Sequence, residues 1–189
     1  MRRLFLSLIL YLFFLSYGVG VFAQTSTVRT KVGNPKGGDG GWPTTGIITQ
    51  GPLGAYDHGP LHLNALDIAN ASSPPVVSAF DGTVIETHDC TAAGDCSIHY
   101  GNSVKVKDSN GIVALYGHFA IVEVKVGQQV MAGEELGIMG TTGHSTGIHV
   151  HYEIIGAPLS PPYVPQEVAP SNCDSDDGIH GIPCNPTNI

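Results

Sequence analysis

The sequence lacks helical periodicity and has few charged residues. Asp, Glu, Lys and Arg make up only 13% of its 189 residues, and beyond the N-terminus no long stretch repeats its apolar residues at the helical period. Gly (25) and Pro (13) are plentiful and, with Asn and Asp, break the chain into short apolar runs. This pattern argues against a helical bundle. It predicts an all-β fold of antiparallel sheets and hairpins, partly barrel-like.

Basic residues are scarce. Eight Lys and Arg stand against 16 Asp and Glu, and the formal net charge is −8. A chain this acidic lacks the positive surface that binds nucleic-acid phosphates or anionic lipids through charge. We therefore expect no nucleic-acid partner. Contact with a membrane is expected only if the N-terminal segment stays in it.

That N-terminal segment is the one long apolar run of the chain. "MRR" is followed by "LFLSLILYLFFLSYGVGVF", and small residues stand at the −3 and −1 positions before Gln24. This order is typical of a secretory signal peptide, here residues 1–23, cleaved after Ala23. The run also approaches the roughly 20 residues that span a bilayer, so an uncleaved anchor through residues 4–23 is the alternative. Either way we expect the rest to be exported, to a secreted, periplasmic or cell-envelope location.

Cysteines with the C-x-x-C spacing of zinc ribbons are absent, which argues against a metal held by thiolates. The four cysteines form two local pairs. Cys90 and Cys96 flank "TAAGD", and Cys173 and Cys184 bracket "DSDDGIHGIP". An even number of cysteines in an oxidising compartment favours disulfides. We predict the bonds Cys90–Cys96 and Cys173–Cys184.

Composition divides the exported chain into three parts. Residues 24–45 are rich in Gly and Pro and are interpreted as a linker or arm. Residues 46–156 hold the strand-like runs, among them the hairpin "SVKVKDSNGIVALYGHF" with its turn at "DSNG". Residues 157–189 are rich in Pro, which predicts an irregular tail that the second disulfide ties down.

Two histidines share one face of the last predicted strand, "IHVHYEIIG". Alternate side chains of a strand point to the same side, so His149 and His151 project together, while Val150 and Tyr152 project toward a core. Two imidazoles about 7 Å apart along a strand can converge on one ion. An isolated His-x-His is more often a pair of surface histidines on a half-exposed strand than a metal site, so the rest of the chain decides.

Further candidate ligands precede this pair. Asp67 lies in the apolar run "ALDIA", where an unpaired carboxylate is costly to bury and a metal would remove that cost. His58 and His62 lie shortly before it, and His118 ends the strand "VALYGHF". A hydrolytic zinc site uses about three His or carboxylate ligands and leaves one position for water. These residues predict one Zn²⁺ per chain, bound in a groove.

The motifs together resemble a known family. From about Gly46 to Ile155 the chain carries a His…Asp element, the "YGH" histidine, the Gly-punctuated hairpins "VKVGQQVMAGEELGIMGTTGHSTG" and the terminal His-x-His, in one order. This arrangement is similar to the M23 zinc metallopeptidases, the lysostaphin- or LytM-type endopeptidases. The resemblance implies an exported zinc metalloendopeptidase that hydrolyses peptide cross-links of bacterial peptidoglycan.

The resemblance also implies separate roles for the metal ligands and the catalytic histidines. The first His of the His…Asp element, Asp67 and His151 would bind Zn²⁺. His118 and His149 would be the catalytic histidines that orient or deprotonate the attacking water and steady the oxyanion. A neutral imidazole with a pKa of about 6.5 suits that proton transfer.

The first ligand departs from the family pattern, H-x-G-x-D, in which the two residues are four apart. Here His62 precedes Asp67 by five positions and His58 precedes it by nine. An odd spacing puts two side chains on opposite faces of a strand unless a bulge or turn intervenes. A turn at "GPL" could return His58 to the site. We therefore favour His58 as the ligand, with His62 as the alternative; the other histidine would line the groove or hydrogen-bond to a ligand.

Two other functions compete. A non-catalytic binding or regulatory module on the same fold would be expected to have lost metal ligands. A lipoyl- or biotinyl-type carrier would share the hairpin rhythm, but Lys125 lies in a strand rather than at a hairpin tip, and export is wrong for a carrier.

Three other residues have open assignments. His144 is expected to line the groove or lie on the surface. Tyr116 should share the strand face of His118, and it would either steady an oxyanion or pack in the core. Trp42 would cover an edge of the core or contact substrate.

Overall fold

The computed structural model describes residues 31–32, 42–52, 58, 62–90, 96–97 and 99–164. The predicted signal segment, most of the predicted linker, and residues 165–189 of the predicted tail, with Cys173 and Cys184, lie outside these residues. The strands are β1 (Lys31–Val32), β2 (Gly46–Gln50), β3 (Ala65–Ala69), β4 (Pro75–Val77), β5 (Gly82–His88), β6 (Ser103–Lys107), β7 (Val113–Gly117), β8 (Phe119–Val122), β9 (Gln129–Val130), β10 (Glu135–Met139) and β11 (His149–Ile155).

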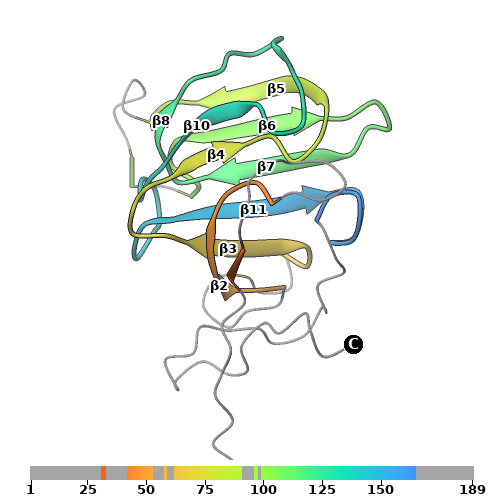
Figure 1. Cartoon of the computed structure of the whole chain (residues 1–189). Helices are drawn as coiled ribbons and strands as arrows, with labels where there is room; N and C mark the ends of the chain where they lie inside the picture. Colours follow the sequence, from red (N-terminus) through yellow and green to blue (C-terminus); the bar gives the residue numbers. More distant parts are fainter. Residues whose placement is uncertain are drawn as a thin grey trace, which may run out of the picture.

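The strands form two antiparallel sheets (Figure 1). The larger has eight strands in the order β1-β2-β3-β11-β7-β6-β5-β9, and the smaller has three in the order β4-β10-β8. The predicted all-β antiparallel class is confirmed. Within the described residues neither strand order closes on itself, so the sheets are open and no barrel is completed.

One apolar core joins the two sheets. The large sheet contributes Val104, Val106, Tyr116, Val150 and Tyr152, and the small sheet and its flanks contribute Val76, Phe119, Leu136 and Met139. Burial of each such side chain stabilises the fold by roughly 1.5–3 kcal/mol. Trp42 is 8% exposed and belongs to this core, which settles its position as a packing residue.

The alternating pattern predicted most of the strands. "GIITQ" is β2, the "SVKVK…IVALYG" hairpin is β6 and β7, and "HVHYEII" is β11. In the hairpin turn, Asp108 accepts hydrogen bonds from the backbone N–H groups of Asn110 and Ile112. Two residues before the predicted core, Lys31 and Val32, pair with β2.

The strand order brings separate motifs together. β11 lies between β3 and β7, and its His151 is paired with Asp67 on one side and with Gly117 on the other. Directly opposed residues of an antiparallel pair have Cβ atoms about 5 Å apart. His118 follows Gly117, so three neighbouring strands deliver three candidate site residues to one place.

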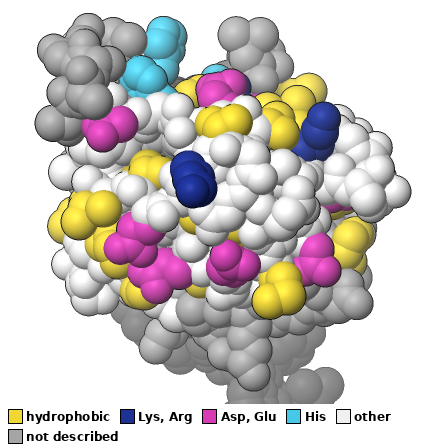
Figure 2. Space-filling model, turned by 90° about the horizontal axis from the view of Figure 1, so that it is seen from above, with side chains coloured by type: hydrophobic (Ala, Val, Ile, Leu, Met, Phe, Trp, Pro, Cys, Tyr) yellow, Lys and Arg dark blue, Asp and Glu magenta, His cyan; other side chains and the backbone are white. Residues whose placement is uncertain are grey.

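The surface agrees with the acidic composition. On the face in Figure 2, acidic side chains are scattered between apolar ones, and histidines gather at one edge. Among the described residues, no helix has both the length and the apolar character needed to cross a bilayer.

Candidate metal centre and groove

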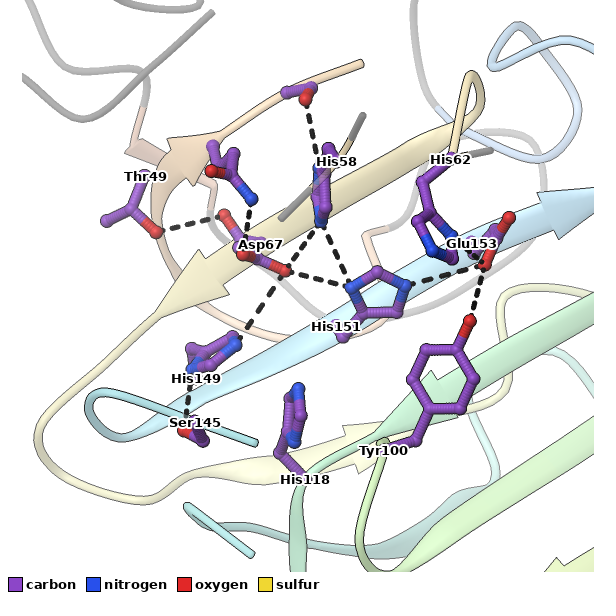
Figure 3. Close-up of polar contacts among 12 residues, drawn as sticks. Thr49, His58, His62, Asp67, Tyr100, His118, Ser145, His149, His151 and Glu153 are labelled. Carbon is purple, nitrogen blue, oxygen red and sulfur yellow. Dashed lines mark hydrogen bonds and ion pairs between the residues drawn. The ribbon is translucent and has the colours of Figure 1, made fainter. Parts of the chain in front are cut away.

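Three side chains from distant parts of the chain converge on one small volume (Figure 3). His58 Nε2 lies 3.1 Å from His151 Nδ1 and 3.2 Å from Asp67 Oδ1, and His151 Nδ1 lies 3.1 Å from Asp67 Oδ1. Ligands about 2.0–2.1 Å from a tetrahedral Zn²⁺ are about 3.3 Å apart. The spacing of these three atoms therefore fits a metal site.

In His58 and Asp67, the side-chain polar atom that points away from the cluster is hydrogen-bonded to another residue. His58 Nδ1–H donates to the carbonyl of Gly51 (2.9 Å), and its Nε2 faces the site. Gln50 Nε2 donates to Asp67 Oδ2 (3.2 Å), which leaves Oδ1. These contacts fix which atom each residue presents.

The cluster is buried: His58 is 0%, His151 3% and Asp67 7% exposed. Burial alone would raise the pKa of Asp67, but hydrogen bonds and positive charge from His151 and His58 hold it well below its usual range. Burial alone would lower the pKa of His151, but Asp67 and Glu153 raise it to about 9. The raised pKa favours a protonated His151 when no metal is bound, and a bound metal would take the place of the Nδ1 proton.

His149 and His118 lie beside the cluster, with ring centroids 4.6 Å apart (Figure 3). His149 Nδ1–H donates to the carbonyl of Gly147 (2.9 Å). Its Nε2 is buried, has no hydrogen-bond partner among the described residues, and lies 3.7 Å from Asp67 Oδ1. A buried, unpartnered nitrogen aimed at the cluster is what a missing ligand or water would satisfy.

Nδ1 of His118, like Nδ1 of His149, is hydrogen-bonded to a backbone carbonyl. Its Nδ1–H donates to the carbonyl of Thr142 (2.7 Å), which leaves Nε2 as a free acceptor. Burial, together with the neighbouring His149, lowers the pKa of His118 to about 4. The imidazole is therefore neutral at neutral pH and able to accept a proton.

The backbone at His118 overturns one expectation. His118 has a φ of 65°, a conformation that few non-glycine residues adopt, so the strand alternation ends at Gly117. Tyr116 does not share the face of His118. It is fully buried beside Tyr152, and its hydroxyl accepts from the backbone N–H of Ala79 (2.9 Å), so it is a core residue.

The disulfide Cys90–Cys96 is confirmed, and it lies close to the loop that holds His118. The carbonyl of Cys96 accepts from the backbone N–H of Gly143 (2.8 Å). Gly101 and Gly143 approach so closely that a Cβ on either would meet the other segment's backbone at 2.6 Å or less. This contact sets the position of Thr142, the hydrogen-bond acceptor of His118.

A groove of about 170 Å³ opens over the cluster. It is lined by His62, His99, Tyr100, His118, His144 and His151. His144, for which groove and surface were both open, lines the groove. His62 lies apart from Asp67; its Nδ1 is 3.1 Å from Glu153 Oε2.

Sequence reasoning missed Glu153, Gln50 and Tyr100. The signal for Glu153 was present, because it follows His151 by two positions and so shares its strand face. Gln50 and Tyr100 had no such signal. Gln50 reaches the site through the pairing of β2 with β3, and Tyr100 lies in a turn, where its carbonyl accepts from the backbone N–H of His118.

The sequence matches a known protein family over the part of the chain that carries most of the site. The family model "Peptidase family M23" matches residues 62–161, which is more than half of the chain. The chain belongs to peptidase family M23. The matched segment contains Asp67, His118, His149 and His151 of the site, whereas His58 lies just before it. Its assignment rests on the geometry of the fold.

Several curated proteins resemble this M23 chain. The "DD-carboxypeptidase/endopeptidase Mpg" of Neisseria meningitidis is 34% identical over 137 residues, 69% of this chain and 30% of the relative. The "Peptidoglycan DD-endopeptidase ShyA" of Vibrio cholerae is 35% identical over 99 residues, 51% of this chain and 21% of the relative. The chain thus spans less than a third of these relatives. A solved "zinc containing peptidase" from Vibrio cholerae is 26% identical, with a TM-score of 0.45, and the match covers 67% of this chain and 33% of that one.

Proposed function

We propose that this M23 chain is a zinc metalloendopeptidase that hydrolyses peptide cross-links of bacterial peptidoglycan. One observation carries the proposal: His58, Asp67 and His151 converge below a groove, and the free Nε2 atoms of His118 and His149 face the same volume.

The donor set supports zinc. Two imidazole nitrogens and one carboxylate oxygen are typical ligands of a catalytic zinc site, which leaves a fourth position open. Zn²⁺ there would act as a Lewis acid that polarises the substrate carbonyl and makes water a stronger nucleophile at neutral pH. His58, Asp67 and His151 would hold one ion per chain.

The two remaining histidines supply the proton transfers. Hydrolysis bonds a water oxygen to the carbonyl carbon, and the water must lose a proton as this bond forms. A neutral imidazole of His118 or His149 accepts that proton at Nε2. When the C–N bond breaks, the leaving nitrogen takes a proton from the same pair. An imidazolium Nε2–H also steadies the negative charge on the carbonyl oxygen.

The substrate class is supported by family membership and by the names of the relatives, which include DD-endopeptidases of peptidoglycan. A peptide would lie in the groove lined by Tyr100, His118 and His144. Peptidoglycan lies outside the cytoplasmic membrane, which agrees with export directed by residues 1–23.

A non-catalytic binding or regulatory module is the competing function. Such a module needs no convergent ligand set and no unpartnered imidazole beside it. The complete His58–Asp67–His151 cluster therefore favours the enzyme.

The test is hydrolysis of cross-linked muropeptides by the purified protein, followed by mass spectrometry of the products. We expect dimers to yield monomers that together have gained one water. A chelator should abolish the reaction and added Zn²⁺ should restore it. Asp67→Ala should lower the rate on the order of 1,000-fold or more, because it removes a metal ligand. A zinc-loaded protein that leaves every dimer intact would contradict the proposal.

A further inference from the structure

A buried carboxylate outside the catalytic cluster has no part in the chemistry described so far. Glu153 is 8% exposed and lies on β11, two positions after His151. A single oxygen, Oε2, receives its contacts: His62 Nδ1 at 3.1 Å, Tyr100 OH at 3.3 Å and His151 Nε2 at 3.5 Å (Figure 3). Burying a carboxylate is costly unless such donors offset the loss of water.

Glu153 and Asp67 approach opposite nitrogens of one imidazole. His151 Nδ1 is 3.1 Å from Asp67 Oδ1, while Nε2 faces Glu153. A carboxylate only accepts hydrogen bonds, so its contact requires a proton on Nε2. With Nε2 protonated, Nδ1 is the nitrogen that can bind a metal.

We propose that Glu153 is the positioning residue that turns His151 Nδ1 toward the metal, and that His62 and Tyr100 hold the carboxylate in place. The inference rests on the proposed function, since it needs a metal in the His58–Asp67–His151 cluster. A carboxylate behind a metal-binding histidine fixes its ring and raises the basicity of the ligating nitrogen. His62 thus acts through Glu153 rather than on the metal.

The same atoms could instead form a second metal site. His62, His151 and Glu153 each offer a ligand atom within 4.8 Å of the others, so they could hold a second ion. His151 would then bind metal through both nitrogens and its ring would have to lose both protons. A donated Nε2–H requires no such loss, so positioning is favoured.

The experiment measures zinc affinity by competition with a chromogenic chelator. Glu153→Ala should weaken zinc binding about 10- to 100-fold. Glu153→Gln should weaken it less, because the amide oxygen still accepts from Nε2–H. Glu123→Gln, at an exposed carboxylate far along the chain, is the matched control and should bind zinc as the parent does.

Each outcome has one meaning. If the parent binds no zinc, the proposed function fails. If the parent binds one ion and both Glu153 variants bind it equally tightly, the positioning inference fails alone. Two ions per parent chain, with one lost in both variants, would overturn it in favour of a second metal site. The melting temperature of each metal-free variant separates weaker binding from unfolding, and Glu153→Gln keeps the test valid if the alanine variant does not fold.

Discussion

At the residue scale, the site depends on hydrogen bonds to the histidine nitrogens that point away from the proposed metal position. Carbonyls of Gly51, Gly147 and Thr142 accept from the Nδ1–H groups of His58, His149 and His118. A carbonyl cannot donate, so each of these contacts fixes the tautomer and leaves Nε2 for the site. Glu153 does the converse for His151 and leaves Nδ1.

Mutation should distinguish His118 and His149, the proposed catalytic histidines, from the proposed metal ligands. His118→Asn and His149→Asn keep polar side chains but remove the proton-accepting nitrogen. We expect each to lower the rate of cross-link hydrolysis about 100- to 10,000-fold while zinc content stays at the parental level. Steady-state kinetics and elemental analysis of the same samples check this. A variant that loses its zinc would be a ligand, contrary to the assignment.

Strand parity predicted much of the site at this scale. It gave the shared face of His149 and His151, while the possible turn at "GPL" favoured His58 over His62 as a ligand. In the structure His58 Nε2 lies 3.1 Å from His151 Nδ1 and 3.2 Å from Asp67 Oδ1. Strand parity failed for Tyr116, because the positive φ of His118 ends the alternation, and no rule of spacing forecasts such a residue.

At the scale of elements, the β3–β11–β7 order creates the site, since β11 pairs His151 with both Asp67 and Gly117. The individual strands were predictable from alternation. Their order was not, because each pairing joins segments far apart in the sequence and periodicity carries no information about partners. The same holds for the contact between the disulfide segment and the 142–144 loop.

The chain after β11 is tied back to the β6–β7 turn. Tyr152 OH donates to the carbonyl of Tyr163 (2.7 Å), and Tyr163 OH donates to Asp108 Oδ2 (3.1 Å). Burial alone would raise the pKa of Asp108, but hydrogen bonds from the backbone N–H groups of Ile112 and Asn110 and from Tyr163 together outweigh it. The pKa therefore lies below its usual value of 3.8.

This carboxylate should make a pH-dependent contribution to stability. A folded-state pKa below the unfolded value stabilises the fold above the unfolded value, near 3.8, and the contribution is lost as pH falls through the folded pKa. Asp108→Asn should therefore lower the free energy of unfolding at pH 7 by about 1 kcal/mol or less, since the turn is largely exposed. The difference from the parent should shrink below about pH 4. Urea titrations across this range measure it; a difference that grows on acidification would refute the assignment.

At the scale of the molecule, the all-β class followed from composition, because Gly- and Pro-punctuated alternating runs leave no long apolar stripe for a helix outside the N-terminus. The division into two open sheets around one core did not follow, because alternating runs fit a sandwich, a barrel or open sheets equally well. The residues of the proposed site are spread over positions 58 to 151, so the fold must form before the site exists.

The central claim is that His58, and not His62, completes the proposed metal site with Asp67 and His151. The direct measurement is zinc per chain, by elemental analysis, in the purified parent, His58→Ala and His62→Ala. We predict close to one ion in the parent, almost none in His58→Ala, and close to one in His62→Ala under saturating zinc. A His58→Ala protein that keeps its ion while His62→Ala loses it would contradict the account.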